Sequence, residues 1–267
     1  MQPAQFVAHV VANTRLGGGY FTLELEADAP TPVAAATPGQ FVMLRGEWGR
    51  ELLNPRAFSV LHASERRLSI LAKPYGRGTK RMAVLRPGER MTVTGPLGIG
   101  FPAPDPAICD LLVAGGVGLP PLHLQARVAA ARGLAGRCEL FYGGRDRHDL
   151  VMLEDFAAWG VTANLATEDG SLGVRGYVTA ALAPRLQAAN ARGEPVRVLA
   201  CGPTPMLHAV RKLCREHATD AFLCLEENMA CGFGVCLGCA VPVHGPKPYR
   251  YCCTDGPVFP AEEVRWP

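Results

Sequence analysis

The fold is decided by Asp110-Leu-Leu-Val-Ala-Gly-Gly-Val-Gly-Leu-Pro-Pro121, an apolar run that leads into a glycine-rich turn. The run has the length and character of a buried strand, and the segment after the turn, 122–132, has the composition of a helix. Further apolar runs lie at 138–142, 161–166, 196–200 and 221–225, with helical stretches such as 206–216 between some of them. This alternation over residues 105–225 predicts a parallel sheet covered by helices, with a mixed α+β domain as the alternative.

The residues before this region, 1–104, predict β structure. Six short apolar or β-branched runs, punctuated by Gly and Pro, lie at 6–12, 21–26, 41–45, 58–62, 68–72 and 91–94. Short strands with this spacing are typical of an antiparallel barrel. Residues 78–85 could add one helix, ended by Pro87.

The residues after it, 226–267, form a tail that is rich in Gly, Pro and Cys. Eight of the ten cysteines lie from residue 201 onward, which favours a local metal site. The strongest motif is Cys231-Gly-Phe-Gly-Val-Cys236-Leu-Gly-Cys239, followed by Cys252-Cys253. This is the C-x4-C-x2-C spacing of plant-type [2Fe–2S] proteins, whose two irons need four thiolates. A zinc site and a set of unrelated buried cysteines are the alternatives, and spacing alone does not choose between Cys252 and Cys253.

Composition and charge exclude several other classes of protein. The net charge is +3 and no block of five basic residues occurs, so neither nucleic acid nor a membrane surface is an expected partner. The most apolar stretch, 111–122, is too short to cross a bilayer, and the first ten residues do not resemble a secretory signal. We therefore expect a cytoplasmic protein with reduced thiols.

Two motifs in the first region fit a flavin. In Arg56-Ala57-Phe58-Ser59, Arg could hold a pyrophosphate, the aromatic ring could flank a flavin, and the hydroxyl could bond a flavin nitrogen. The simpler interpretation is a surface Arg beside a core Phe. In Gly76-Arg-Gly78-Thr79, glycines before a helix could cradle a phosphate. The alternative there is an ordinary turn with Thr79 as the helix cap.

Two motifs in the second region fit a dinucleotide. Gly115-Gly116-Val-Gly118 lies between a strand and a helix, although it is not the G-x-G-x-x-G fingerprint. Cys201-Gly202-Pro203 ends another strand of the same predicted sheet, and open α/β sheets bind ligands at this edge. Cys201 has no neighbour at metal-ligand spacing, so its alternative role is that of a small core residue.

Five motifs follow one another along the chain: Arg-x-Phe-Ser, Gly-x-Gly-Thr, Gly95-Pro-Leu-Gly98, Gly-Gly-x-Gly and Cys-Gly-Pro. In this combination they resemble the ferredoxin–NADP reductase superfamily over nearly the whole chain. The resemblance becomes more specific in two segments of the tail, 225–239 and Cys253-Thr-Asp-Gly-Pro-Val-Phe259. Both closely resemble the electron-transfer subunits of NAD-linked heteromeric dihydroorotate dehydrogenases. A further segment, Thr167-Glu-Asp-Gly-Ser-Leu-Gly173, is typical of the same subunits.

This resemblance implies an oxidoreductase subunit in pyrimidine biosynthesis. Electrons from the FMN of a separate catalytic subunit would pass through a [2Fe–2S] cluster and FAD to NAD⁺, without any catalytic acid or base in this chain. The three regions 1–104, 105–225 and 226–267 would bind FAD, NAD and the cluster, and two copies of each subunit would form a heterotetramer. The implied FAD site comprises Arg56, Ala57, Phe58, Ser59, Leu71, Ala72, Lys73, Gly78 and Thr79. The implied NAD site comprises Gly115, Gly116, Gly118, Cys201, Gly202 and Pro203, and the implied cluster ligands are Cys231, Cys236, Cys239 and Cys253.

The chain departs from the family pattern at two positions: Ala57 stands where proline is usual, and Cys252 stands beside the implied ligand Cys253. Rival assignments remain. One is the small subunit of an NAD(P)H:ferredoxin or sulfide dehydrogenase complex, and another is a zinc-binding scaffold module. Arg145 and Arg147 could meet the 2′-phosphate of NADP, or they could be solvated loop charges.

Overall fold

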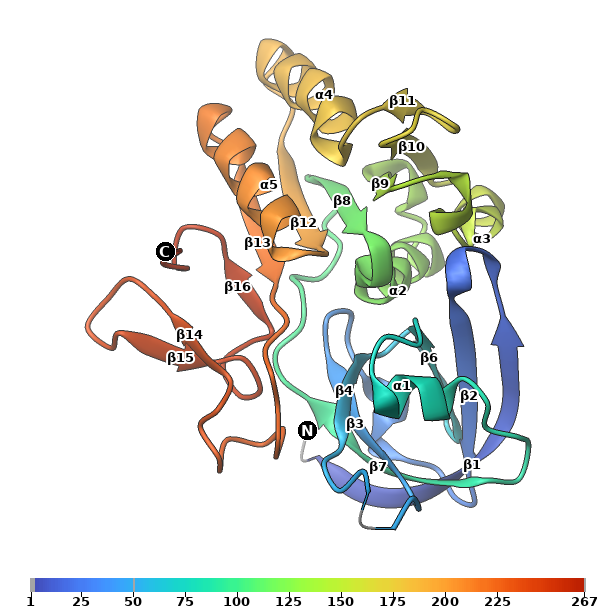
Figure 1. Cartoon of the computed structure of the whole chain (residues 1–267). Helices are drawn as coiled ribbons and strands as arrows, with labels where there is room; N and C mark the ends of the chain where they lie inside the picture. Colours follow the sequence, from blue (N-terminus) through green and yellow to red (C-terminus); the bar gives the residue numbers. More distant parts are fainter. Residues whose placement is uncertain (1–2, 50, 267) are drawn as a thin grey trace.

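Two sheets and a tail make up the molecule (Figure 1). The computed structural model describes residues 3–49 and 51–266, so residues 1, 2, 50 and 267 of the predicted regions lie outside the described part. The first sheet is antiparallel and curls into a half-barrel, with the strand order β4-β3-β7-β1-β2-β6-β5. Its strands are β1 (Ala4–Arg15), β2 (Phe21–Ala27), β3 (Phe41–Gly46), β4 (Arg56–Ser59), β5 (His62–Ala63), β6 (Arg67–Ala72) and β7 (Arg90–Leu97).

The half-barrel follows from the alternation of apolar side chains. In β2, Phe21, Leu23 and Leu25 are buried while the residues between them are partly exposed, which is the pattern of a strand with one face on a core. The predicted run 58–62 changes partner halfway: β4 pairs with β3, whereas β5 pairs with β6. The predicted helix is present but shorter, as α1 (Arg77–Met82).

The second sheet has the order β11-β10-β9-β8-β12-β13-β16 and is parallel except for its last strand. All seven residues of β8 are buried, because helices cover both faces of the sheet. Its strands are β8 (Cys109–Gly115), β9 (Cys138–Gly144), β10 (Thr162–Thr167), β11 (Val174–Arg175), β12 (Val196–Cys201), β13 (Asp220–Cys224) and β16 (Val258–Pro260).

Two helices pack on each face of this sheet. One core contains side chains of α2 (Leu119–Ala131) and α3 (Leu153–Trp159), and the other contains side chains of α4 (Val178–Arg192) and α5 (Thr204–Glu216). Short 3₁₀ turns connect elements at Gly17–Gly19, Pro32–Ala35, Gly116–Gly118, Ala135–Arg137 and Arg147–Asp149. The predicted fold class, an antiparallel barrel followed by a parallel-sheet domain and a cysteine-rich tail, is confirmed.

The segment that joins the two sheets is held by a buried ion pair. Arg197 Nε lies 2.6 Å from Asp110 Oδ1, and both side chains are buried. Arg197 also donates to the carbonyl of Ala103 at 2.6 Å, and Gln125 donates to the carbonyl of Pro102 at 3.1 Å. The connection is therefore fixed to the second sheet and to α2 rather than free to swing.

The tail does not build a core of its own. It forms a small hairpin, β14 (Ala240–Pro242) and β15 (Tyr249–Tyr251), and then returns to the second sheet as β16. Cys239, Val241 and Phe259 share one core with residues of β13 and α5. Packing against existing elements supplies the apolar burial that a short Gly-rich segment lacks.

Candidate functional site

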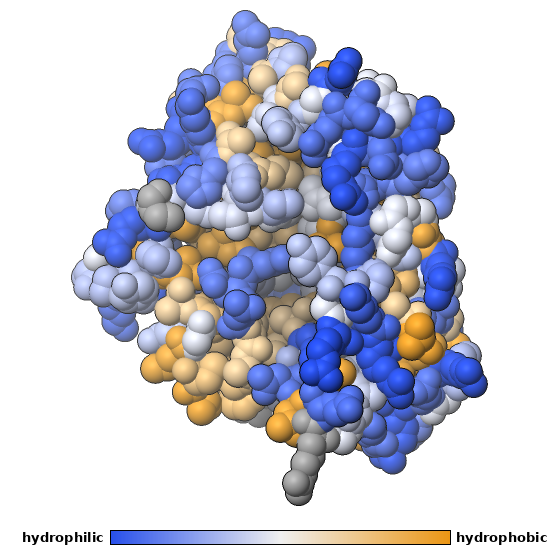
Figure 2. All heavy atoms as spheres, in the orientation of Figure 1, coloured by the Kyte–Doolittle hydropathy of each residue, from blue (hydrophilic) through white to orange (hydrophobic). Residues whose placement is uncertain are grey.

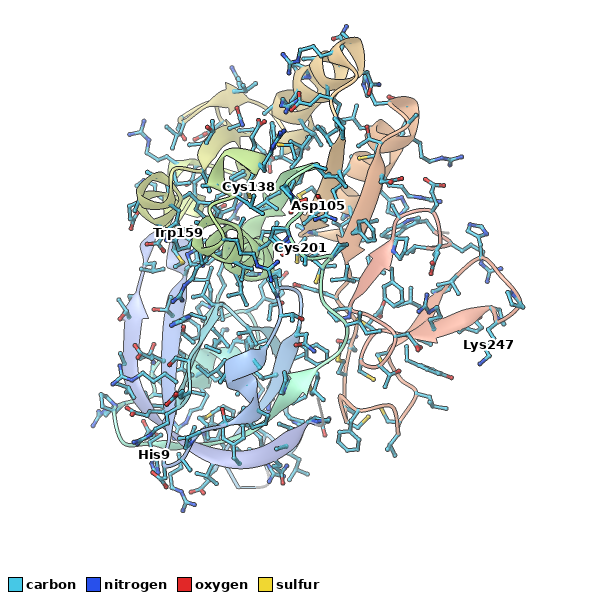
Figure 3. The ribbon with its side chains drawn as sticks, turned by 180° about the vertical axis from the view of Figure 1, so that it is seen from behind. His9, Asp105, Cys138, Trp159, Cys201 and Lys247 are labelled. Atoms are coloured by element: carbon cyan, nitrogen blue, oxygen red, sulfur yellow. The ribbon has the colours of Figure 1, made fainter. Side chains whose placement is uncertain are left out.

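A cleft of about 1260 Å³ lies between the half-barrel and the C-terminal edge of the second sheet. Figure 3 shows Cys201 near the middle of the molecule, where these two parts meet. Most of the residues predicted to bind flavin or dinucleotide line this one cleft: Arg56, Ala57, Phe58, Ser59, Leu71, Ala72, Lys73, Thr79, Gly115, Gly116, Gly202 and Pro203. The structure thus brings together residues from five separate parts of the sequence.

The other three predicted residues, Gly78, Gly118 and Cys201, lie behind the cleft wall. A Cβ atom on Gly78 would come within 2.2 Å of Arg56 Nε, and one on Gly118 would come within 2.2 Å of the Cys201 carbonyl oxygen. Cys201 is buried, at the end of β12. These positions shape the wall from behind, because only glycine permits such close approach.

Arg56 and Thr79 belong to the flavin motifs. Arg56 donates from Nη1 to the carbonyl of Asn54 at 2.5 Å and lies 5.9 Å from the centre of the Trp48 ring, so the guanidinium is held at the cleft. The Thr79 hydroxyl accepts a hydrogen bond from the Gly76 backbone N–H at 3.0 Å, which makes Thr79 a cap of α1 as well as a cleft residue. A fixed guanidinium and a glycine-rich helix start fit the pyrophosphate of a flavin dinucleotide.

Ala57 lies in a strand rather than in a loop. It is the register partner of Met43 in the β3–β4 ladder, and its side chain lines the cleft. The ladder holds the backbone here, so the absence of the proline that the family pattern predicts leaves no loosened loop.

A charged network that the sequence analysis missed crosses one end of the cleft. Asp149 Oδ1 lies 2.6 Å from Lys73 Nζ, and Asp149 Oδ2 lies 3.1 Å from Arg145 Nε. Burial opposes ionisation of Asp149, but the hydrogen bonds from Lys73 and Arg145 lower the pKa of its carboxyl below the usual value. The network joins Lys73, which directly follows β6 of the half-barrel, to the loop after β9 of the second sheet.

The two arginines considered for an NADP phosphate already have partners in the protein. Arg145 binds Asp149, and Arg147 donates to the Ser171 carbonyl at 2.7 Å. An arginine that is already paired is a weaker phosphate ligand than a free one. This arrangement suits NAD.

The wall nearest the tail consists of residues that the motifs did not indicate. Cys224 and Leu225 at the end of β13 line the cleft, and so do the four residues that follow, 226–229. Two positions later the first cysteine of the motif, Cys231, begins the cluster loop, which we define as residues 231–239. The cleft and the cluster loop are therefore joined by a single short stretch of chain.

Glycines allow the cluster loop to pack tightly. Gly232 and Gly234 both have φ of 85°, and a Cβ on Gly232 would come within 2.5 Å of Met43 Cγ in β3. A Cβ on Gly238 would not clash with any neighbour. The adjacent residue Leu237 has a positive φ of 57° although it is not a glycine. The loop is thus pressed against the half-barrel at Gly232.

The four predicted cluster ligands lie as two pairs. The sulfur atoms of Cys239 and Cys253 are 3.2 Å apart, and both residues are buried. The Cys236 backbone N–H donates to the Cys231 sulfur at 3.4 Å, nearer the surface. Within the described residues, no three His, Cys, Asp or Glu side chains are gathered closely enough to hold a metal ion as the loop stands.

The chemistry of this loop nevertheless fits an iron–sulfur centre. Burial opposes ionisation of Cys231, but backbone N–H groups of Cys236, Phe233 and Val235 point at its sulfur and lower the pKa of the thiol to about 6. Backbone donors directed at thiolate sulfur are the surroundings that tune such clusters. Cys252 is fully buried and turns its sulfur away from this set, toward the Leu225 carbonyl at 3.3 Å.

In the described part of the chain, none of the helices combines the length and the apolar character needed to cross a membrane.

Comparisons with known proteins agree with this geometry. Residues 226–265 match the family model of the iron–sulfur cluster binding domain of dihydroorotate dehydrogenase B, and residues 112–212 match that of the oxidoreductase NAD-binding domain. The dihydroorotate dehydrogenase B (NAD(+)) electron transfer subunit of Shouchella clausii is 34% identical over 269 residues, which cover 96% of each chain. The corresponding subunit of Geobacillus kaustophilus is 38% identical over 234 residues, covering 85% of this chain and 86% of that one.

Solved structures show the same architecture. An NADH-dependent reduced ferredoxin-NADP oxidoreductase superposes with a TM-score of 0.81 at 25% identity, covering 97% of this chain and 90% of that one. The ferredoxin reductase of carbazole 1,9a-dioxygenase superposes with a TM-score of 0.70 at 23% identity, covering 82% and 67%, which supports the fold. By its sequence relatives, its cluster domain and its fold, the chain belongs to the family of electron transfer subunits of NAD(+)-linked dihydroorotate dehydrogenase B.

Proposed function

We propose that this chain is the subunit through which an FMN-containing dihydroorotate dehydrogenase catalytic subunit passes electrons to NAD⁺ in pyrimidine biosynthesis. The observation that carries the proposal is the direct connection between the cleft wall at 225–229 and the cluster loop. A flavin-sized cleft and a cluster site on one short stretch of chain suit a protein that moves electrons between two cofactors.

FAD would be held on the half-barrel side of the cleft, with Arg56 at its pyrophosphate. The other residues of this site would be Ala57, Phe58 and Ser59 of β4, Leu71 and Ala72 of β6, Lys73 just after β6, and Gly78 and Thr79 at the start of α1. NAD would lie over Gly115, Gly116 and Gly118 and reach toward Cys201, Gly202 and Pro203. Cys231, Cys236, Cys239 and Cys253 would bind the [2Fe–2S] cluster. When bound, FAD and the cluster supply the exchange between two-electron hydride transfer and one-electron transfer.

In this proposal the described residues position the cofactors and do not transfer protons. Lys73, Asp149 and Arg145 tie the two sheets together beside the cleft. Gly78 and Gly118 let the wall approach closely, and the paired arginines leave no free cation dedicated to a 2′-phosphate at that loop. Such fixed walls suit hydride transfer, which depends on the relative placement of two rings.

The cluster loop also offers a surface for the catalytic partner that the family implies. Phe233, Val235 and Leu237 are 53%, 72% and 51% exposed, although they are large and apolar. Figure 2 shows apolar surface at the lower left, where this loop lies in Figure 1. Exposed apolar side chains grouped in this way mark protein contact sites, and a contact here would bring the cluster next to the partner. A two-plus-two heterotetramer is our proposal for the assembly.

We place the complex in the cytoplasm. All ten cysteines are free thiols in the structure, and several are buried side by side, which suits a reducing compartment.

The test is an anaerobic purification with and without a co-expressed dihydroorotate dehydrogenase catalytic subunit, followed by an assay of dihydroorotate-dependent NAD⁺ reduction. We expect a chain that carries FAD and two irons, and activity only in the co-purified complex. A colourless, zinc-containing protein would replace the proposal by the scaffold interpretation.

A second candidate rests on the superposition with the NADH-dependent reduced ferredoxin-NADP oxidoreductase over 97% of the chain. If FAD and iron are present but dihydroorotate yields no NADH with a competent partner, the chain is instead the small subunit of an NAD(P)H:ferredoxin or sulfide dehydrogenase complex.

A further inference from the structure

Cys252 and Cys253 are neighbours in sequence but turn their thiols in opposite directions. The Cys253 sulfur lies 3.2 Å from the Cys239 sulfur, whereas the Cys252 sulfur lies 3.3 Å from the carbonyl oxygen of Leu225. Cys252 is fully buried, so its thiol has this internal partner rather than water. The two cysteines therefore have different surroundings.

The Leu225 carbonyl needs a donor because of a proline opposite it. The antiparallel ladder of β13 and β16 pairs Leu223 with Phe259 and Cys224 with Val258, and it continues with a bond from the Leu225 N–H to the Pro257 carbonyl at 2.8 Å. In a regular ladder the opposite residue returns a bond from its own N–H, but proline has none. The Cys252 thiol supplies that donor and satisfies an otherwise unpaired buried carbonyl.

The backbone of the same residue reaches the cluster loop. The Cys252 N–H donates to the Cys239 carbonyl at 2.9 Å. Leu225 lines the cleft, and Cys239 is one of the proposed cluster ligands. One buried residue is therefore hydrogen-bonded to the cleft wall through its side chain and to the cluster loop through its backbone.

We propose that Cys252 is a positioning residue and not a cluster ligand. It ties the cluster loop to the cleft wall at Leu225 and so fixes where the cluster stands relative to the flavin. This inference rests on the proposed function, because it assumes that the cleft holds FAD and that Cys239 binds the cluster. It assigns the fourth ligand position to Cys253 on grounds of geometry.

The test compares three variants of the full chain, purified anaerobically. Cys252→Ala removes the donor, and Cys252→Ser keeps one. Cys214→Ala removes a thiol that is equally buried, on α5, as a matched control. The measurements are iron and flavin content, the electron paramagnetic resonance spectrum of the dithionite-reduced cluster, and the rate at which NADH reduces the cluster.

We expect all three variants to retain two irons and FAD. Cys252→Ala should shift the resonance spectrum and slow reduction of the cluster, because a cluster loop released from the cleft wall no longer holds the cluster at a fixed position relative to the flavin. Cys252→Ser and Cys214→Ala should match the parent. If the alanine variant does not fold, Cys252→Val fills the space without a donor and takes its place.

Two results would overturn the inference. Loss of iron in both Cys252→Ala and Cys252→Ser would make Cys252 a ligand. An alanine variant with the parent's spectrum and rate would show that the tether has no effect on the cluster. Absence of iron or flavin from the parent chain is a different result, because it contradicts the proposed function itself.

Discussion

The Asp149 carboxylate connects the two sheets beside the cleft. Its carboxylate is shared between Lys73 on the half-barrel and Arg145 on the second sheet, with its own side chain only 8% exposed. Lys73 also lies 4.0 Å from the centre of the Tyr20 ring. Breaking one of these contacts leaves a buried charge with fewer partners.

Lys73→Met should lower the free energy of unfolding of the flavin-free protein by about 2–4 kcal/mol at pH 7, because Asp149 keeps only Arg145. The pKa of Asp149 is lowered in the folded parent, so its contribution is present above the ordinary Asp pKa and is lost as the pH falls through the lowered value. The difference between parent and variant should therefore shrink in acid. Urea unfolding at several pH values measures it, with Lys80→Met on the surface as control; a difference that does not depend on pH would contradict the role of Asp149.

The sequence could not have indicated Asp149. All five residues of the loop 145–149 are charged or titratable, and nothing in its spacing separates Asp149 from Asp146. By contrast, the motifs that contain Arg56, Thr79 and Gly115 predicted residues that do line the cleft, because each combines glycines or an Arg with the end of a strand or helix. Lys73 was implied only by the family resemblance. Partnerships that form only when two sheets meet have no local signal.

The apolar runs of the sequence predicted the strands well and their connections less well. The runs at 138–142 and 196–200 became β9 and β12, since a strand buried on both faces is continuously apolar. The run 58–62 split into β4 and β5 because its two halves pair with different strands. The return of the tail as β16 was not predicted, since Val258–Pro260 is too short to carry a periodic pattern.

The connection between the sheets offers a further test. Asp110→Ala leaves Arg197 buried without its counter-ion and removes the carboxylate that accepts hydrogen bonds from both Arg197 and Gln125, the two side chains bonded to the connecting segment. We expect a loss of about 3–5 kcal/mol in the free energy of unfolding. Asp28→Ala is the control, because that carboxylate is 89% exposed. Urea denaturation followed by circular dichroism gives both values, and a loss below about 1 kcal/mol for Asp110→Ala would show that the ion pair is not needed.

The functions of the cleft and of the cluster loop should be separable by mutation. Phe233→Asp puts a charge into the exposed apolar surface of the cluster loop without touching the cleft. Binding of the catalytic subunit should weaken by at least about tenfold, as expected for an apolar residue central to an interface. NADH-dependent reduction of ferricyanide by the isolated chain should not change.

The matched control is Val84→Asp, an apolar residue that is 56% exposed on the half-barrel. Calorimetric titration with the catalytic subunit compares the two variants. Equal weakening by both substitutions, or none by Phe233→Asp, would move the interface away from the cluster loop.

The antiparallel strand β16 has one more consequence. Without it, β13 would be an open edge of a largely parallel sheet, with unpaired N–H and C=O groups available to a second molecule. The cluster-binding segment therefore also covers the edge of β13 and prevents it from pairing with a second molecule. A variant trimmed to the flavin and dinucleotide regions would lose β16 and expose the edge of β13, so removing the cluster segment would also change the end of the sheet.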